Sequence, residues 1–363
     1  MEYYSFDQID STGANWRIVF GERSNGKSYG SKMKMIANFL QAGKQFAYLR
    51  RNVEEIKMRR VSAYFDDMLK DGYLEKTCRK HYGKEYKGFY VVPKNGAFFL
   101  HAHRQKDDAD ENLGKMGYYF SLNQARYDKT NPYPDVNMIV FDEFLCKPSE
   151  EIPDEFSQLL NLVSTIKRKR EDMVIYLLGN TVNRNSQIME AMNINLRTLK
   201  QGEIRVYDFY SDNAHNTVAV EYTDNFEQSS KSESFFTFGN QRERMITKGE
   251  WETGDYKTDI VPIGYNDDTV QLAILFQSNE VRLYGYIRDD DQMFIGEKRL
   301  PDLKAEFIVI TTGETIPNRM TFSIQDPRVL DLMIYVRTLH DIGAITYDQN
   351  VTGFDFEVFL KNM

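Results

Sequence analysis

Short apolar runs and helical periodicities alternate along the first part of the chain. Residues 16–20 form an apolar, β-branched run that predicts a strand, and apolar residues recur at helical spacing over residues 27–41. Gly43 ends this predicted helix, and residues 46–49 predict a second strand. The order strand, helix, strand predicts a βαβ unit and therefore a parallel sheet.

Further apolar runs continue the pattern. Residues 136–141 and 173–178 are continuously apolar, as in strands that are covered on both faces, and residues 154–170 between them are helix-like. Residues 88–92 and 97–101 flank the turn sequence Pro-Lys-Asn-Gly and predict an inserted hairpin.

The pattern changes after Val206, where the apolar runs become short and polar segments interrupt them. We therefore expect an α/β domain at 1–210, a linker at 211–255 and a smaller mixed α/β domain at 256–363. In the last of these, residues 271–276, 281–287 and 306–311 predict strands, and residues 329–339 predict a helix. A chain of 363 residues is long enough for two such cores.

The composition is that of a folded protein, with 41% hydrophobic and 28% charged residues. No apolar run approaches the ~20 residues that span a bilayer, and the N-terminal segment is acidic where a secretory signal is basic. Cys78 and Cys146 are too few for a disulfide framework. We expect a cytoplasmic protein without a membrane partner.

The net charge of −8 is unevenly distributed, because residues 256–363 carry 10 Lys+Arg against 17 Asp+Glu. The remainder is nearly neutral and keeps local basic faces at Lys57, Arg59 and Arg60 and at residues 167–170. Bulk charge therefore neither proves nor excludes a nucleic-acid partner. No stretch interleaves basic and aromatic residues in a way that predicts stacking on single-stranded bases.

Residues 21–28 match the phosphate-binding pattern G-x-x-x-x-G-K-[ST] and lie between a predicted strand and a predicted helix. Backbone N–H groups of such a loop surround phosphates, and the helix N-terminus favours the anion. Lys27 would hold the β- and γ-phosphates of ATP, and Ser28 would hold Mg²⁺. The candidate ATP-binding residues are Gly21, Arg23, Ser24, Asn25, Gly26, Lys27 and Ser28. Arg23 is either a ligand of the γ-phosphate or of a carboxylate, or a solvated loop arginine.

A second candidate element is the strand at 136–141, which ends in Asp142 and Glu143. Asp142 would hold Mg²⁺, and Glu143 is placed to polarise an attacking water. Asn180 and Thr181 follow the next apolar run and are candidate sensors of the γ-phosphate, although polar residues after a strand are commonly only a turn. His101 and His103 lack a third ligand at a recognisable spacing, which favours structural histidines over a metal site.

Together these residues resemble the DNA-packaging (encapsidation) ATPases of small tailed bacteriophages of the podovirus type, which are related to the ATPase domain of large terminases. The resemblance is carried by residues 21–28 with their internal arginine, by residues 139–144, and by the size of the C-terminal domain. It implies a P-loop NTPase of the additional-strand (ASCE) class that forms a homopentameric ring. In the host cytoplasm, such a ring drives double-stranded DNA into a prohead, with the portal and a structural RNA as partners.

The resemblance also implies roles for basic residues. Arg23 corresponds to a catalytic loop arginine, and an arginine finger from a neighbouring subunit falls at residues 167–170, with Arg170 preferred to Arg168. Lys129 or Arg126 would supply a further trans-acting cation. Translocation of any sequence requires phosphate contacts, for which the candidates are Lys57, Arg59, Arg60 and Lys94.

The C-terminal domain resembles a vestigial RNase H-like nuclease. Its run Asp289-Asp290-Asp291 is more typical of a solvated turn than of a metal site, so we expect no nuclease activity. Three alternatives remain open: a large terminase with an active nuclease, a small-molecule P-loop phosphotransferase, and a non-catalytic, nucleotide-gated assembly protein.

Overall fold

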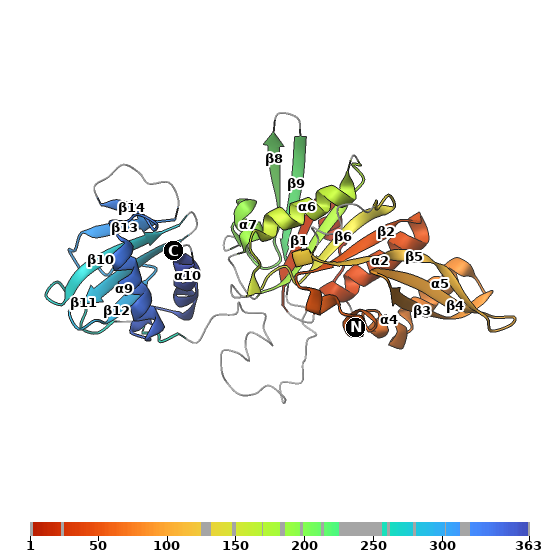
Figure 1. Ribbon diagram of the computed structural model, residues 1–363, viewed down its shortest axis with the longest axis horizontal. Coiled ribbons are helices and arrows are strands. Elements are labelled where there is room, and N and C mark those ends of the chain that lie inside the picture. The colour runs from red at the N-terminus through yellow and green to blue at the C-terminus, as the bar shows by residue number, and fades with distance from the viewer. Residues whose placement is uncertain are drawn as a thin grey trace. The chain divides into compact units, whose positions relative to one another are not determined.

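A computed structural model of the chain describes residues 3–22, 25–124, 132–146, 150–168, 170–181, 186–196, 199–211, 214–224, 256–259, 262–278, 281–301, 303–312 and 320–361. The chain divides into two compact units, Met1–Trp251 and Glu252–Met363 (Figure 1). Within these ranges, no helix combines the length and the apolar character that crossing a bilayer requires.

The first unit is built on a nine-stranded sheet in the order β3-β4-β5-β2-β6-β7-β1-β9-β8. The six strands from β5 to β9 in this order are parallel, whereas the β3–β4, β4–β5 and β8–β9 pairs are antiparallel. The strands are β1 (Trp16–Gly21), β2 (Gln45–Arg50), β3 (Tyr86–Lys94), β4 (Ala97–Arg104), β5 (Asp110–Ser121), β6 (Val136–Asp142), β7 (Val174–Asn180), β8 (Ile204–Ser211) and β9 (Ala214–Tyr222).

Helices cover both faces of this sheet. They are α1 (Asp7–Ser11), α2 (Lys27–Ala42), the 3₁₀ helix η1 (Val53–Ile56), α3 (Met58–Val61), α4 (Asp66–Lys70), α5 (Tyr73–Tyr82), α6 (Glu155–Lys167) and α7 (Gln187–Ala191). Since successive strand residues point to opposite faces, Ile18 of β1 packs into the core with α6 and α7, and Val19 packs into the core with α2, α4 and α5.

The predicted strands at 16–20, 46–49, 136–141 and 173–178, and the helices at 27–41 and 154–170, are confirmed as β1, β2, β6, β7, α2 and α6. The predicted hairpin is confirmed as β3 and β4. The sequence pattern did not predict β5, which joins this hairpin to the parallel strands by pairing with both β4 and β2.

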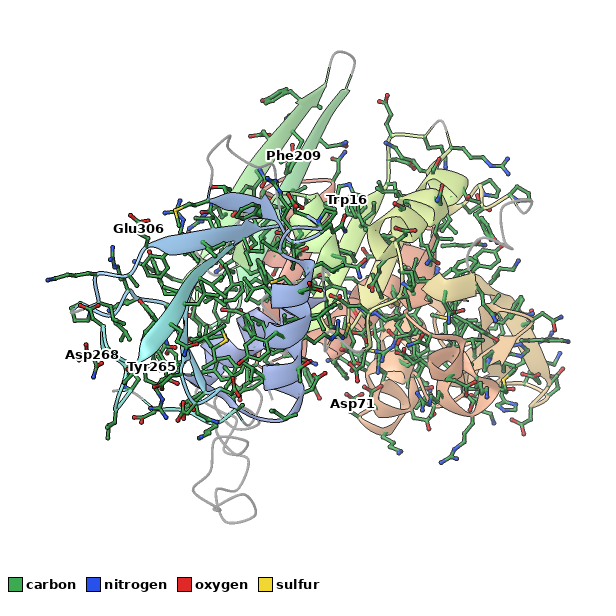
Figure 2. All side chains as sticks on the ribbon, turned by 60° about the vertical axis from the view of Figure 1, so that its left-hand side comes forward. Trp16, Asp71, Phe209, Tyr265, Asp268 and Glu306 are labelled. Carbon is green, nitrogen blue, oxygen red and sulfur yellow. The ribbon has the colours of Figure 1, made fainter. Side chains whose placement is uncertain are left out.

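The expected linker at 211–255 is wrong at its start. Residues 214–222 form β9, which pairs in parallel with β1, because its buried residues Val218 and Val220 complete the core of the first unit. The β8–β9 hairpin projects from the sheet and carries Phe209 (Figures 1 and 2). Residues 225–255 lie outside the described residues.

The second unit has a six-stranded sheet in the order β14-β13-β10-β11-β12-β15. The β10–β11 and β11–β12 pairs are antiparallel, and β13, β14 and β15 join in parallel to β10, β13 and β12. Its elements are β10 (Val270–Gln277), β11 (Arg282–Arg288), β12 (Met293–Gly296), β13 (Phe307–Thr311), β14 (Thr321–Ser323), α9 (Leu330–Asp341), β15 (Ile345–Tyr347) and α10 (Asn350–Leu360). The strands predicted at 271–276, 281–287 and 306–311 and the helix at 329–339 are present.

Candidate functional site

The candidate site lies where parallel strands of the first unit end. β1, β2, β6 and β7 all run in one direction, so their carboxyl ends meet at one edge of the sheet, where α/β proteins bind ligands. Gly21 of β1 lies opposite Asn180 of β7, and Asp142 of β6 lies opposite Leu178. The loop at 21–28 and the acidic pair at 142–143 therefore lie at the same edge of the sheet.

Two glycines shape the loop before α2. Gly26 has φ +90°, a left-handed conformation that favours glycine, and α2 begins at the next residue. At Gly21, a Cβ atom would lie 2.0 Å from Thr223 Oγ1. Asn25 Nδ2 donates a hydrogen bond to the same hydroxyl at 2.8 Å, so the end of β9 holds the loop in place.

The hydroxyl of Ser28 meets the carboxylate of Asp142. Ser28 Oγ donates to Asp142 Oδ1 at 3.1 Å, although the two residues are 114 positions apart in the sequence. Burial raises the pKa of Asp142, and the neighbouring Glu143 adds to this, whereas Arg50 and the Ser28 hydrogen bond oppose it. A hydroxyl and a carboxylate are the oxygen ligands that Mg²⁺ prefers, so the pair fits this ion.

Lys27 lies beneath the loop. Its Nζ donates to Glu22 O at 2.7 Å, to Asn25 Oδ1 at 3.0 Å and to Gly21 O at 3.3 Å. Burial lowers the pKa of Lys27 to about 7, against the opposing influence of Asp142 and Glu22. A bound phosphate would stabilise the charged ammonium that the free loop disfavours.

The carboxylate of Glu143 is held by Arg50, a residue that the sequence interpretation missed. Arg50 Nη2 donates to Glu143 Oε2 at 2.6 Å, and the same guanidinium pairs with Glu55 at 2.6 Å and approaches Asp142 at 3.7 Å. In the sequence, the one feature that indicated Arg50 as a site residue was its position at the end of a predicted parallel strand. Glu143 itself has φ +59°, and strained backbone of this kind concentrates at functional sites.

Arg51, which the sequence interpretation also missed, fixes the segment after β6. Its guanidinium donates to the backbone oxygens of Phe144 at 2.6 Å and Glu143 at 3.1 Å. It also forms a buried ion pair with Glu155 at 2.8 Å, with side-chain exposures of 5% and 2%. Arg51 therefore fixes the backbone that carries Glu143.

The other predicted site residues have different outcomes. Thr181 N donates to Gly21 O at 3.2 Å and Asn180 lies opposite Gly21, so both candidate sensors are brought to the loop. Arg23, Ser24, Arg126 and Lys129 lie outside the described residues. Arg168 is exposed at the C-terminus of α6.

Arg170 lies at the opposite edge of the sheet, before β7. Its guanidinium donates to Pro134 O at 2.6 Å, Ile166 O at 2.6 Å and Tyr133 O at 3.1 Å, so it joins the end of α6 to the segment before β6. In this arrangement Arg170 has a structural role and cannot reach the acidic pair of its own chain.

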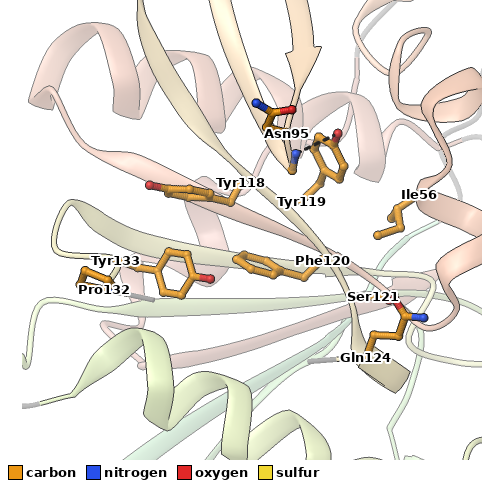
Figure 3. A pocket seen from close by; sticks show the side chains of 10 residues that line it. Ile56, Asn95, Tyr118, Tyr119, Phe120, Ser121, Gln124, Pro132 and Tyr133 are labelled. Atoms are coloured by element: carbon orange, nitrogen blue, oxygen red, sulfur yellow. Dashed lines mark hydrogen bonds between the residues drawn. The ribbon is translucent and has the colours of Figure 1, made fainter. Parts of the chain in front are cut away.

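The candidate DNA-binding residues are exposed. Lys57 pairs with Glu54, and Arg59 and Arg60 lie on α3. Lys94 ends β3 at the tip of the hairpin. Ile56, which precedes Lys57, and Asn95, which follows Lys94, line the same pocket (Figure 3). The structure therefore brings the basic residues at 57–60 and Lys94 to the same part of the first unit.

Within the described ranges, no group of three or more His, Cys, Asp and Glu residues could hold a metal ion. His101 lies 3.2 Å from Asp110. In the second unit, Asp290 accepts from Arg288 at 2.7 Å, and Asp291 accepts from Tyr335, so these adjacent acids have different partners.

Comparisons with known proteins show which proteins this chain is similar to. The family model of the podovirus DNA encapsidation protein (Gp16) matches residues 1–188. The DNA packaging protein of Bacillus phage phi29 is 34% identical over 183 residues, which are 50% of this chain and 47% of that protein. The corresponding protein of Bacillus phage B103 is 31% identical over 168 residues, 46% of this chain and 44% of that protein. The aligned region thus spans about half the length of these relatives.

Among solved structures, the bacteriophage Phi-29 viral genome packaging motor assembly matches 99% of this chain and 99% of its own chain, with 23% identity and a TM-score of 0.51. The Phi-28 DNA packaging motor matches 99% and 98%, with 17% identity and a TM-score of 0.52. At these identities the likeness is one of fold: a mixed α/β chain with large, parallel-rich sheets.

Proposed function

Since the chain belongs to the podovirus DNA encapsidation protein family, we propose that it is an ATP-hydrolysing motor that moves double-stranded DNA into a prohead. The observation that carries this proposal is the 3.1 Å contact between Ser28 Oγ and Asp142 Oδ1. It joins a phosphate-binding loop to an acidic strand end, the combination on which ATP hydrolysis by P-loop proteins depends. The first unit is then a P-loop NTPase domain of the ASCE class.

The residues at the sheet edge have separate tasks in this proposal. Ser28 and Asp142 would hold Mg²⁺, which when bound neutralises phosphate charge. Lys27 and the N–H groups at the start of α2 bind the β- and γ-phosphates, with Gly21, Asn25 and Gly26 shaping the loop. Arg23 and Ser24 complete the loop, and Asn180 and Thr181 sense the γ-phosphate.

Glu143 polarises the attacking water in this proposal. Its carboxylate accepts from Arg50 in the free chain, so it has to exchange that partner before it can accept a proton from water. Arg51 keeps the Glu143 backbone in place during the exchange, because its own partners are backbone oxygens and the buried Glu155.

We also propose that hydrolysis occurs at the subunit interfaces of a ring. The resemblance implies that this ring is a pentamer. Arg170 is the proposed finger because the resemblance implies one at residues 167–170, and from the edge of the sheet opposite the acidic pair it could serve only a neighbouring copy. To do so it must exchange the carbonyl oxygens of Tyr133, Pro134 and Ile166 for phosphate oxygens. Arg168, Lys129 and Arg126 are the further trans-acting candidates. Lys57, Arg59, Arg60 and Lys94 would contact the DNA phosphates.

For the second unit we propose a vestigial RNase H-like nuclease without activity. The antiparallel β10–β11–β12 meander with β13 and β14 added in parallel beside β10 supports this fold. At the carboxyl ends of β10 and β13, Gln277 lies opposite Thr311, and neither of these residues is an acid of the kind that holds catalytic metal ions. We also propose that the chain acts in the host cytoplasm while attached to the prohead, with the portal and a structural RNA as its partners.

The test is ATP turnover by the full chain with and without double-stranded DNA. We expect DNA to stimulate turnover, and Glu143→Gln to lower it by about a hundredfold or more while nucleotide binding persists. Glu75→Gln, at a half-buried glutamate of α5 that pairs with Arg79 and accepts from Phe89 N, is the matched control and should turn over like wild type.

The alternatives give different results in the same preparation. Metal-dependent nicking of DNA would identify a large terminase with an active nuclease. Turnover that requires a small acceptor and ignores DNA would identify a phosphotransferase. Full packaging activity of Glu143→Gln would contradict hydrolysis and favour a nucleotide-gated assembly protein.

A further inference from the structure

Basic side chains cover the exposed face of α5, a helix that takes no part in the phosphate-binding site. Residues 76–87 hold four Lys and one Arg against a single acid, Glu85. Lys76 and Lys80 are exposed, and each lies two positions from the fully buried Cys78, which places them on the opposite side of the helix. The helix therefore turns its cations to solvent and its apolar residues to the core.

Neighbouring acids neutralise only part of this charge. Arg79 pairs with Glu75, and Lys87 pairs with Asp108 at 3.2 Å. Three exposed lysines form no ion pair within the part of the chain that the structure describes: Lys76, Lys80 and Lys84. Like charges four residues apart on a helix repel each other and disfavour the helix. This row of lysines is therefore unfavourable until an anion binds to it.

The helix dipole does not explain the whole row. Cations in the last turn of a helix interact favourably with its free carbonyl groups, which accounts for Arg79 and Lys80. Lys76 lies nearer the start of α5, and Lys84 follows the helix beyond Gly83, so neither is in the last turn. These two positions call for another explanation.

The row lies away from the candidate DNA contacts of the proposed function. β3 is antiparallel to β4, β4 is antiparallel to β5, and β5 is parallel to β2, so β3 ends at the carboxyl edge of the sheet with Lys94. Lys84 comes two residues before β3, and β3 (Tyr86–Lys94) spans roughly 25 Å. Figure 1 shows α5 beside β3 and β4. Lys84 therefore lies toward the amino edge, opposite Lys94.

We propose that Lys76, Lys80 and Lys84 form a second contact surface for double-stranded DNA, the α5 surface, which binds the phosphate backbone. Lys76 and Lys80 are one helical turn apart, about 6 Å along the axis, and each DNA strand carries a phosphate every 3.4 Å, so the row can reach successive phosphates of one strand. Phosphate contacts carry no sequence information, as the transport of any DNA requires.

This inference rests on the proposed function, which supplies the duplex to a member of a DNA encapsidation family. A second surface allows one chain to retain the duplex while the contacts at the carboxyl edge release it and bind again. Double-stranded RNA offers the same phosphates, so the experiment includes it.

The experiment measures binding of a fluorescent duplex of about 20 base pairs to the full chain by anisotropy at several salt concentrations. Neutralising the three lysines should weaken DNA binding at low salt by about tenfold or more, and should reduce the slope of log Kd against log salt by about 2–3, since each phosphate contact contributes about 0.9. The variant is Lys76→Gln/Lys80→Gln/Lys84→Gln.

Two controls separate loss of contact from loss of structure. Lys76→Arg/Lys80→Arg/Lys84→Arg keeps the cations and should keep the wild-type slope. Lys298→Gln/Lys304→Gln/Lys361→Gln removes the same charge from exposed positions of the second unit and should keep it too. An unchanged slope in the glutamine variant of α5 would overturn the proposal, and an equal loss in the second-unit variant would reduce it to an effect of net charge.

Lysine acetylation of the wild-type chain gives a readout that needs no variant. Mass spectrometry should show Lys76, Lys80 and Lys84 protected severalfold by the DNA duplex, with Lys298 unprotected. Equal acetylation with and without DNA would overturn the proposal. RNA that binds more tightly than DNA and protects the same lysines would overturn the assignment to DNA.

ATP turnover by the wild-type chain separates this inference from the proposed function. DNA-stimulated turnover with an unchanged slope in the glutamine variant would contradict the α5 surface alone. A reduced slope in a chain that does not hydrolyse ATP would contradict the proposed motor and support the α5 surface.

Discussion

At the residue scale, three groups of the candidate site are held in unfavourable states. Lys27 is buried with a lowered pKa, Asp142 is buried with a raised pKa, and Glu143 has a left-handed backbone. Each is disfavoured in the free chain, and the proposed phosphate and Mg²⁺ ligands would relieve the first two. The sequence indicated these residue types, but it could not show their burial, which arises from strands far apart along the chain.

The pKa of Lys27 predicts a proton uptake on nucleotide binding. The pKa lies at about 7 in the folded chain and at 10.5 ordinarily, so at pH 8 the free ammonium is mostly deprotonated and a bound phosphate should restore its proton. Calorimetry of ATP-analogue binding at pH 8, in buffers of different ionisation enthalpy, should show close to one proton taken up. Lys27→Met should show none. An uptake that is unchanged in Lys27→Met would contradict the assignment.

The lowered pKa of Lys27 also predicts how the free energy of unfolding changes with pH. The unfolded chain binds more protons at Lys27 than the folded chain between about pH 7 and 10.5, so this residue makes the free energy of unfolding rise with pH in that window. Urea unfolding of wild type and Lys27→Met across this range should show the rise in wild type relative to the variant. A parallel pH dependence of the two chains would count against a buried Lys27.

Gly21 offers a third prediction at this scale. Gly21→Ala places a methyl group against the Thr223 hydroxyl and should lower the free energy of unfolding by about 1–3 kcal/mol. The control is Gly43→Ala, where φ is +63° and no atom lies within 4 Å, so the cost is that of backbone strain alone, about 1 kcal/mol. Thermal unfolding measures both. Equal losses in the two variants would show that Thr223 does not restrict the loop.

At the scale of elements, the candidate site depends on how β2 is joined to the segment between β6 and α6. Arg51 follows β2 and Glu155 begins α6, and their buried pair connects the two elements. Apolar periodicity predicted both elements with nearly correct bounds. It could not predict the connection, because β2 and α6 are separated by an inserted hairpin and by β5, whose polar residues gave no clear strand pattern.

We expect Arg51→Met to lower the free energy of unfolding by about 3–5 kcal/mol, because it leaves the carboxylate of Glu155 buried without its partner. The double variant Arg51→Met/Glu155→Leu should recover most of this loss. Arg79→Ala breaks an exposed pair with Glu75 and should cost less than about 1 kcal/mol. Denaturant unfolding measures all three, and a double variant no more stable than Arg51→Met would contradict the account.

At the scale of the whole molecule, Arg170 and the acidic pair lie at opposite edges of one sheet. A single chain cannot bring them together without refolding, so a finger role requires a second copy. This requirement gives the proposed ring a physical basis, since each interface would unite the loop edge of one copy with the opposite edge of its neighbour.

Mixing inactive variants tests this arrangement. Arg170→Ala and Lys27→Ala should each lack turnover, and an equal mixture should recover up to about a quarter of wild-type activity, because random assembly rebuilds that share of interfaces. A mixture of Arg170→Ala with the Arg170→Ala/Lys27→Ala double variant should recover none. Melting temperatures are measured alongside, since Arg170 also joins α6 to the segment before β6. Absence of rescue at every mixing ratio would exclude a finger at this position.

The sequence by itself determined the local elements and the chemistry at their ends: the glycine-rich loop, the helix that begins at Lys27, and the strand that ends in Asp142 and Glu143. These follow from the periodicity and composition of neighbouring residues, which are local properties. Only the tertiary structure decided what those ends meet, namely Ser28 at Asp142, Arg50 at Glu143 and Thr223 at the loop. Such contacts depend on strand order, and strand order is fixed by burying all apolar faces at once, which no short stretch of sequence records.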